Sequence, residues 1–375
     1  MRRRRRRRGL KKAGIFAAAA ILPFAAGIGV KAAPVITGIA EKIGGIRVGF
    51  EEEPDWYTGE PGFSIQSFQG EEEVISEGFG WSAEVSQNDD EDNTADEGAK
   101  PYPDEWNVSE ENTVYASSFG RYSGSKYFSL DGGGQVRNET DISNGVLLEE
   151  SRLEPEFKIE LNGEPQVLIM HTHTTESFEP YVREYFDPSF NYRTTDSRYN
   201  TVSVGDEICE ELKKSGIGYI HDTTIHDYPS YNGSYERSAE TVKKILEEYP
   251  SIKVVLDIHR DAIGTNESIM QPTVEIDGKK SAQVMIISGC DDGTMDMPNY
   301  LQNFRFASLL QQQMASDYEN LARPVLFDYR KYNQDLTTGS LLIEVGTHGN
   351  TLEQVQYAGE LVGKSLSKAL KSITE

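Results

Sequence analysis

The stretch VLIMHTHTTESFEP spans Val167 to Pro180 and changes character partway along. Its apolar start ends at a His-Thr-His triplet, and Glu176 follows three residues after the second histidine. A short apolar run bounded by polar residues predicts a buried strand. The sequence therefore places two of its six histidines, His171 and His173, at the end of a strand.

The same arrangement recurs twice further along the chain. The apolar run in IKVVLDIHRDA ends at His259 and Arg260, and Glu344 lies inside SLLIEVG. Between and after these runs, residues 201–216, 234–250, 299–318 and 351–373 carry apolar side chains at helical spacing. Strands that alternate with helices predict an α/β fold with an open, largely parallel twisted sheet flanked by helices.

The polar groups at these strand ends have the chemistry of a catalytic metal site. Ligands in open α/β sheets bind at the carboxyl ends of the strands, so the distant segments are expected to meet there. Zn²⁺ accepts imidazole and carboxylate ligands, and a catalytic site commonly uses three of them. We expect His173, His259 and one carboxylate to bind zinc. Glu344, on an apolar strand, would have a pKa raised by burial, which suits a general base.

The N-terminus predicts a membrane anchor. MRRRRRRRGLKK is followed by an uncharged run from Ala13 to Val30. Such a run is long for a signal peptide and short for a membrane span, and the arginines favour a cytoplasmic start. We expect residues 1–33 to be an uncleaved anchor, so that the protein is single-pass in the cell membrane with its catalytic domain outside the cytoplasm. Cleavage near Val30 to Ala32 is the alternative.

The rest of the chain divides by composition. Residues 51–112 hold 20 Asp/Glu and one Lys, which predicts an acidic flexible linker over 34–112. We assign 113–156 to an N-terminal extension of the catalytic domain and 157–375 to the domain itself. The net charge of −24 argues against binding to nucleic acid. Two cysteines exclude a disulfide-rich scaffold and favour buried thiols.

Several of these segments carry a family resemblance. VLIMHTHTTESFEP, VVLDIHRDA, YNQDLTTGSLLIEVGTHGNTLEQV and the basic, then apolar, N-terminus together resemble stage II sporulation protein P. The resemblance implies a membrane-anchored cell-wall hydrolase similar to zinc-dependent N-acetylmuramoyl-L-alanine amidases. It implies cleavage of the amide between N-acetylmuramic acid and L-alanine in peptidoglycan during engulfment, with stage II sporulation protein D as partner. Some family members are also described as cutting the peptide cross-link.

The resemblance also implies roles for particular residues. His173 and His259 match the zinc histidines, and Glu344 matches the catalytic Glu. The wider amidase group takes its carboxylate ligand from the start of the next helix, where this chain has Asn200. We therefore propose Glu176 as the third ligand, with His171 as its rival or as a supporting group.

Other residues are weaker candidates. Arg260, Asn333 and Asn350 are candidates for contacts to sugar or peptide, and His348 is a candidate fourth ligand or substrate contact. Two other functions stay open: an inactive amidase-like domain that binds peptidoglycan or a partner, and a peptidase that acts only on cross-links.

Overall fold

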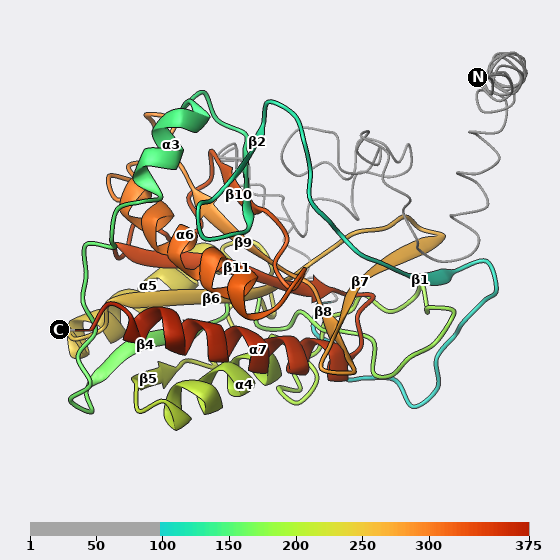
Figure 1. The fold of residues 1–375 in the computed structure, drawn as a ribbon. Coiled ribbons are helices and arrows are strands. Elements are labelled where there is room, and N and C mark those ends of the chain that lie inside the picture. Colours follow the sequence, from blue (N-terminus) through green and yellow to red (C-terminus); the bar gives the residue numbers. More distant parts are fainter. Residues whose placement is uncertain (1–97, 375) are drawn as a thin grey trace, which may run out of the picture. The chain divides into compact units, whose positions relative to one another are not determined.

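The computed structural model describes residues 98–374, and these form an α/β fold (Figure 1). The strands are β1 (Thr113–Ser117), β2 (Tyr127–Ser129), β3 (Gln135–Asn138), β4 (Pro165–Met170), β5 (Gly218–His221), β6 (Val254–Asp261), β7 (Ser268–Ile276), β8 (Lys279–Ala282), β9 (Val284–Gly289), β10 (Val325–Asp328) and β11 (Gly339–Thr347). The helices are α3 (Asn144–Glu150), α4 (Thr201–Lys214), α5 (Ser234–Glu248), α6 (Tyr300–Asp317) and α7 (Leu352–Lys371).

The main sheet has eight strands within the described residues, in the order β2-β3-β10-β9-β11-β6-β4-β5. Neighbouring strands run parallel except at β2–β3 and at β9–β11, which are antiparallel. The prediction of a largely parallel sheet is therefore confirmed. The block β11-β6-β4 is parallel, so the carboxyl ends of these three strands meet at one edge.

Helices cover both faces of this sheet. The core on one face joins α4, α6 and α7 to alternate strand residues such as Val167, Leu256 and Ile343. On the other face, α5 packs Val242 against a separate set that includes Leu168 and Val255. Because successive strand residues point to opposite faces, apolar runs rather than alternating patterns mark these doubly covered strands.

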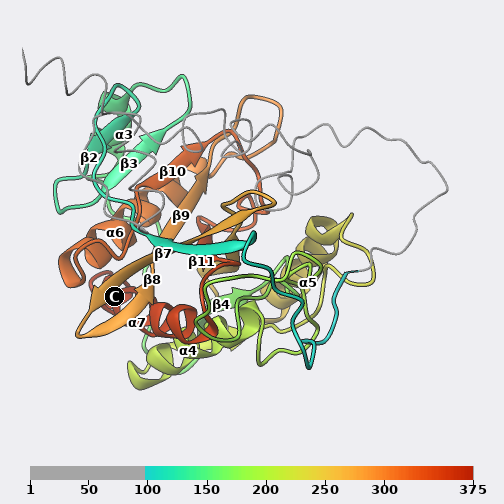
Figure 2. The ribbon, with the colours of Figure 1, turned by 90° about the vertical axis from the view of Figure 1, so that its right-hand side faces the viewer.

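A smaller sheet of order β1-β7-β8 lies beside the main one (Figure 2). The sequence analysis missed the β7–β8 hairpin. Its turn is Asp277-Gly278, where both residues have positive φ, the geometry of a type I′ hairpin turn. The Asp-Gly pair between two extended runs was the available signal.

Residues 98–112 fall in the range that the sequence assigned to a flexible linker, yet they contact the catalytic domain. The Lys100 amide donates to Arg193 O at 3.0 Å, and the Asn107 amide donates to Asp187 Oδ2 at 2.7 Å. The Tyr102 ring packs on Phe190 with a centroid distance of 5.4 Å. Aromatic side chains give this end of an otherwise acidic segment enough apolar area to dock.

Two further expectations concern membrane-spanning segments and the cysteines. Within 98–374 no helix combines the length and the apolarity that a membrane crossing requires. The predicted anchor over 1–33 and most of the predicted linker lie outside the described residues. The expectation of buried thiols is confirmed, because Cys209 and Cys290 are both free and buried.

Candidate metal centre

Three side chains converge where β4 and β6 end. His173 Nδ1 lies 3.4 Å from Glu176 Oε1, and His259 Nδ1 lies 3.5 Å from Glu176 Oε2. One potential ligand atom from each residue lies within 4.8 Å of the others. The three residues are at most 4% exposed. The structure thus brings together the two histidines and the carboxylate that the sequence nominated.

The donor set fits a zinc ion. Two imidazoles and one carboxylate are a common catalytic zinc set, which leaves a coordination position for water. His173 Nδ1 and Glu176 Oε1 are buried without a hydrogen-bond partner. Buried polar atoms are normally paired, so these two atoms are arranged for a ligand that the protein itself does not supply.

The loop after β4 holds Glu176 in place. The Glu176 amide donates to His173 O at 3.1 Å and closes a tight turn. The Thr201 amide at the start of α4 donates to Glu176 O at 2.9 Å. The amide of Arg260 donates to the Glu176 carboxylate itself, at Oε2, over 3.1 Å. Hydrogen bonds to His173 and Thr201 therefore fix the backbone of Glu176, and the bond from Arg260 fixes its carboxylate.

Asp257 lies two residues before His259 on β6 and orients its ring. His259 Nε2 lies 2.9 Å from Asp257 Oδ1, although Nε2 is not aligned for a hydrogen bond to that oxygen. The amide of Thr172 donates to Asp257 Oδ1 at 2.8 Å, and its hydroxyl donates to Oδ2 at 2.7 Å. Burial alone would lower the pKa of His259, but the charges of Asp257 and Glu176 hold it well above its usual value. A cation at this place would replace the proton that these carboxylates favour.

Glu344 lies on β11 directly beside His259 on β6, because the two residues are register partners. It is 2% exposed, and its Oε2 has no hydrogen-bond partner. Burial, followed by the charge of Asp261, raises the pKa of Glu344 well above its usual value. Asp261 is in turn paired with the buried Arg323, whose Nη1 lies 2.8 Å from Asp261 Oδ2.

His171 does not join the cluster. Its Nδ1 lies 3.1 Å from Ile258 O, and its Nε2 lies 3.0 Å from His221 Nε2. Burial, followed by the charge of His221, lowers the pKa of His171 to about 3. Both ring nitrogens are thus occupied within the fold, so the geometry places Glu176, and not His171, between the two other histidines.

The three asparagines considered from the sequence have structural partners. Asn200 caps α4, since its Oδ1 accepts from the Val202 amide at 3.0 Å. Asn333 Nδ2 donates to Tyr235 O and to Ser238 Oγ. Asn350 Nδ2 donates to Pro272 O and to Gln354 Oε1. Both N–H groups of Asn333 and of Asn350 are used, so either residue could donate to a substrate only by breaking one of these bonds.

Sequence analysis missed the aromatic wall of the centre. The Tyr231 ring lies 4.5 Å from the His173 ring, and the Tyr235 ring lies 5.5 Å from it, measured between centroids. Arg193 covers Tyr231, with 4.7 Å from its Cζ to the ring centroid. The signal was the two tyrosines of SYNGSYER at the start of α5, which the helical pattern alone does not single out.

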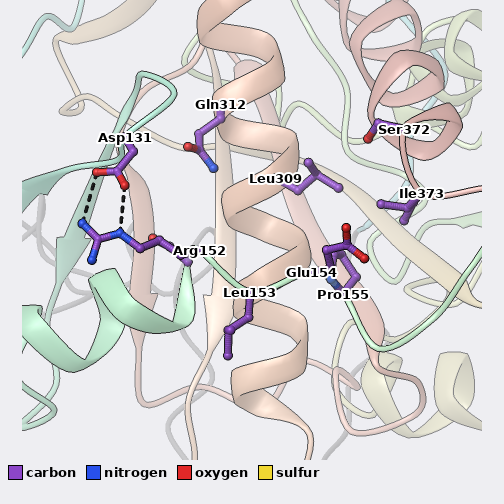
Figure 3. A pocket seen from close by; sticks show the side chains of 10 residues that line it. Asp131, Arg152, Leu153, Glu154, Pro155, Leu309, Gln312, Ser372 and Ile373 are labelled. Atoms are coloured by element: carbon purple, nitrogen blue, oxygen red, sulfur yellow. Dashed lines mark hydrogen bonds and ion pairs between the residues drawn. The ribbon is translucent and has the colours of Figure 1, made fainter.

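A hollow of about 310 Å³ lies between the end of α3, α6 and the end of α7 (Figure 3). Its Arg152 is paired, with Nε 2.8 Å from Asp131 Oδ2. Ser372 and Ile373 line it, whereas the metal centre lies near the other end of α7, roughly 30 Å away at 1.5 Å per residue. The hollow is therefore separate from the centre.

Comparison with known proteins places this chain in a family. The model of the family described as stage II sporulation protein P matches residues 64–367. The chain belongs to the stage II sporulation protein P family. A stage II sporulation protein P of Bacillus subtilis (strain 168) is 32% identical over 213 residues, which are 54% of this chain and 50% of that protein. The chain thus spans about half the length of this relative.

Solved amidase structures share a weaker likeness with this member of the stage II sporulation protein P family. AmiC2 of Nostoc punctiforme is 10% identical, with a TM-score of 0.33, over 55% of this chain and 96% of that one. An N-acetylmuramoyl-L-alanine amidase of Clostridium difficile 630 is 14% identical, with a TM-score of 0.32, over 56% and 97%.

Proposed function

We propose that this protein is a zinc-dependent peptidoglycan hydrolase of sporulation that cleaves the amide between N-acetylmuramic acid and L-alanine. The observation that carries the proposal is the convergence of His173, Glu176 and His259 beside a buried, unpartnered Glu344. Family membership supports the sporulation context.

The metal would be held by His173, Glu176 and His259. A bound zinc ion supplies Lewis-acid chemistry, since it acidifies water and polarises a carbonyl oxygen. Asp257 keeps the His259 ring in one orientation, and the Arg260 amide does the same for the Glu176 carboxylate.

Glu344 is the proposed general base and acid. Its carboxylate takes a proton from the attacking water and returns it to the amine that leaves as the C–N bond breaks. Hydrolysis then gives a muramyl carboxylate and a peptide with a free L-alanine amine. A buried carboxyl with a raised pKa holds the transferred proton better than an exposed one does, which suits it to this relay.

The products released from peptidoglycan also distinguish the amidase from the two alternative functions. A peptidase acting on cross-links would leave the muramyl–alanine amide intact and shorten the stem peptide. An inactive binding domain would release nothing. The purified full-length chain, incubated with zinc and peptidoglycan, should release stem peptides with a free L-alanine terminus, as identified by mass. Release of shortened stems alone, or no release, would refute the amidase proposal.

The location and partner are proposals from the sequence. The run of arginines before an apolar stretch supports an anchor in the cell membrane with the catalytic domain outside the cytoplasm. Stage II sporulation protein D is the proposed partner, on family membership. Fractionation with carbonate washing and co-purification from sporulating cells test these two points.

A further inference from the structure

Arg260 differs from the other buried arginines in having no acidic partner. Of the five arginines classed as buried within 98–374, four form ion pairs with carboxylates: Arg137, Arg193, Arg323 and Arg330. Arg260 is 3% exposed, its Nε has no hydrogen-bond partner, and no described carboxylate lies within ion-pair distance of its guanidinium. A buried charge without a partner is costly, so a fold that keeps one has a use for it.

The position of Arg260 is next to the proposed metal centre. It follows His259 on β6, and its own amide donates to Glu176. The guanidinium of Arg260 is near enough to Glu176 to interact electrostatically with its carboxylate. An anion held by this guanidinium would therefore lie within electrostatic reach of the proposed metal centre.

His348 provides a second unpartnered group at the same place. Its amide donates to Asp261 O at 3.3 Å, so it lies next to the residue that follows Arg260. Its Nδ1 is buried with no hydrogen-bond partner, and its ring packs on Tyr192 with a centroid distance of 5.2 Å. Burial, followed by the charge of Arg260, lowers the pKa of His348 to about 3. A neutral imidazole has one N–H to donate.

We propose that Arg260 and His348 form a carboxylate-binding subsite that holds a free carboxylate of the stem peptide, on the residue that follows L-alanine. The proposal rests on the proposed function for its substrate. A guanidinium matches the geometry of a carboxylate, and charge-assisted bonds to it in a buried site are strong. The subsite would make the enzyme select stems in which this carboxylate is free over stems in which it is amidated.

The test compares two muropeptides that differ only in amidation of that carboxylate. The wild-type chain should show a kcat/KM about 10- to 100-fold higher for the free acid, the range expected for one charge-assisted contact. Arg260→Met should abolish this preference by slowing the free acid alone. Equal rates on both substrates for the wild-type chain, or equal losses on both for the variant, would overturn the proposal.

The melting temperature, Tm, distinguishes a binding role for Arg260 from a structural one. Arg260→Met removes an unpaired buried charge and keeps a similar length, so its Tm should equal or exceed that of the wild-type chain. Arg323→Met is the matched control, because it strands Asp261 and should lower the Tm by several degrees. A Tm loss in Arg260→Met as large as in the control would contradict the binding role.

A binding measurement tests the subsite independently of the proposed reaction. The free stem peptide, with or without the amidated carboxylate, is titrated into the zinc-loaded wild-type chain and Arg260→Met. Tighter binding of the free acid by the wild-type chain only would support the subsite even if neither muropeptide were cleaved, an outcome that would refute the amidase function alone. Equal affinities would overturn the subsite alone.

Discussion

Glu344 and His259 are register partners on the adjacent parallel strands β11 and β6, although 85 residues separate them in the chain. Side chains of register partners lie on the same face of a sheet, so a carboxyl without a hydrogen-bond partner at one oxygen lies beside an imidazole of the proposed metal centre. This relationship assigns different roles to the two acidic residues of the centre. Glu176 lies between His173 and His259, and Glu344 lies beside His259 alone.

Glu344→Gln should abolish most of the activity without removing the metal. The amide keeps the shape of the side chain but cannot accept a proton, so kcat should fall about 10²- to 10⁴-fold. Zinc content, measured by atomic emission on the purified variant, should equal that of the wild-type chain. Full activity in this variant would show that the proton relay runs elsewhere.

Glu176 and His171 should respond differently to replacement. Glu176→Gln weakens a ligand, and zinc affinity should fall by more than the 10- to 100-fold typical of a supporting residue. His171→Gln is the matched control, because His171 bonds to Ile258 O and His221 instead. Competition with a chromogenic chelator gives both affinities. A larger loss in His171→Gln would reverse the ligand assignment.

Gly205 on α4 allows the His171–His221 pair to exist. A Cβ at this position would lie 2.6 Å from His221 Nε2 and 3.0 Å from His171 Nε2. Gly205→Ala should therefore destabilise the protein by about 1–3 kcal/mol, despite the better helix propensity of Ala. Gly145→Ala on α3 is the control, since its Cβ meets only open space and Ser143 Oγ at 4.0 Å. Chemical denaturation should show a neutral or stabilising effect there, and a stabilised Gly205→Ala would contradict the packing described.

Glu179 should make the stability of the protein depend on pH. Its carboxylate accepts hydrogen bonds from the Tyr192 hydroxyl and the Arg183 guanidinium, and burial raises its pKa to about 6. An acid with a raised folded-state pKa is penalised when charged. The penalty is full above about pH 6, shrinks as the pH falls, and disappears below the unfolded-state pKa near 4.5.

The measurement compares the free energy of unfolding of the wild-type chain and Glu179→Gln at pH 7.5 and pH 4.5. Relative to the variant, the wild-type chain should gain about 1.6 kcal/mol on going to the lower pH, at 1.36 kcal/mol per pKa unit and with the unfolded carboxyl half protonated at pH 4.5. A constant difference, or a relative loss at low pH, would contradict the raised pKa.

The sequence was sufficient to predict the parallel strands and the polar residues near their carboxyl ends, although β6 and β11 continue past His259 and Glu344 to Asp261 and Thr347. Predominantly apolar runs before His171, His259 and Glu344 identify buried strands, and parallel strands bring their carboxyl ends together. The choice between His171 and Glu176 was not predictable in the same way. Two histidines one residue apart would share a face if the strand continued, but β4 ends at Met170 and the chain turns. Strand ends are fixed by tertiary pairing, so they cannot be read to one residue.

The remaining features depend on contacts between distant segments. The antiparallel placement of β9 beside β11 leaves no local signal in an apolar strand. Tyr231 and Tyr235 approach His173 only because α5 packs against the face of β4 and β6. Arg260 was a candidate by position alone, and its lack of an acidic partner required the full set of contacts.

The most direct test of the account is an anomalous-difference map at the zinc edge from crystals of the zinc-loaded chain. The account predicts a single strong peak within coordination distance of His173 Nδ1, the Glu176 carboxylate and one ring nitrogen of His259, with Glu344 beside the peak and not bound to it. A peak bound by His171, or a metal that leaves His173 and His259 on different sites, would contradict the central claim.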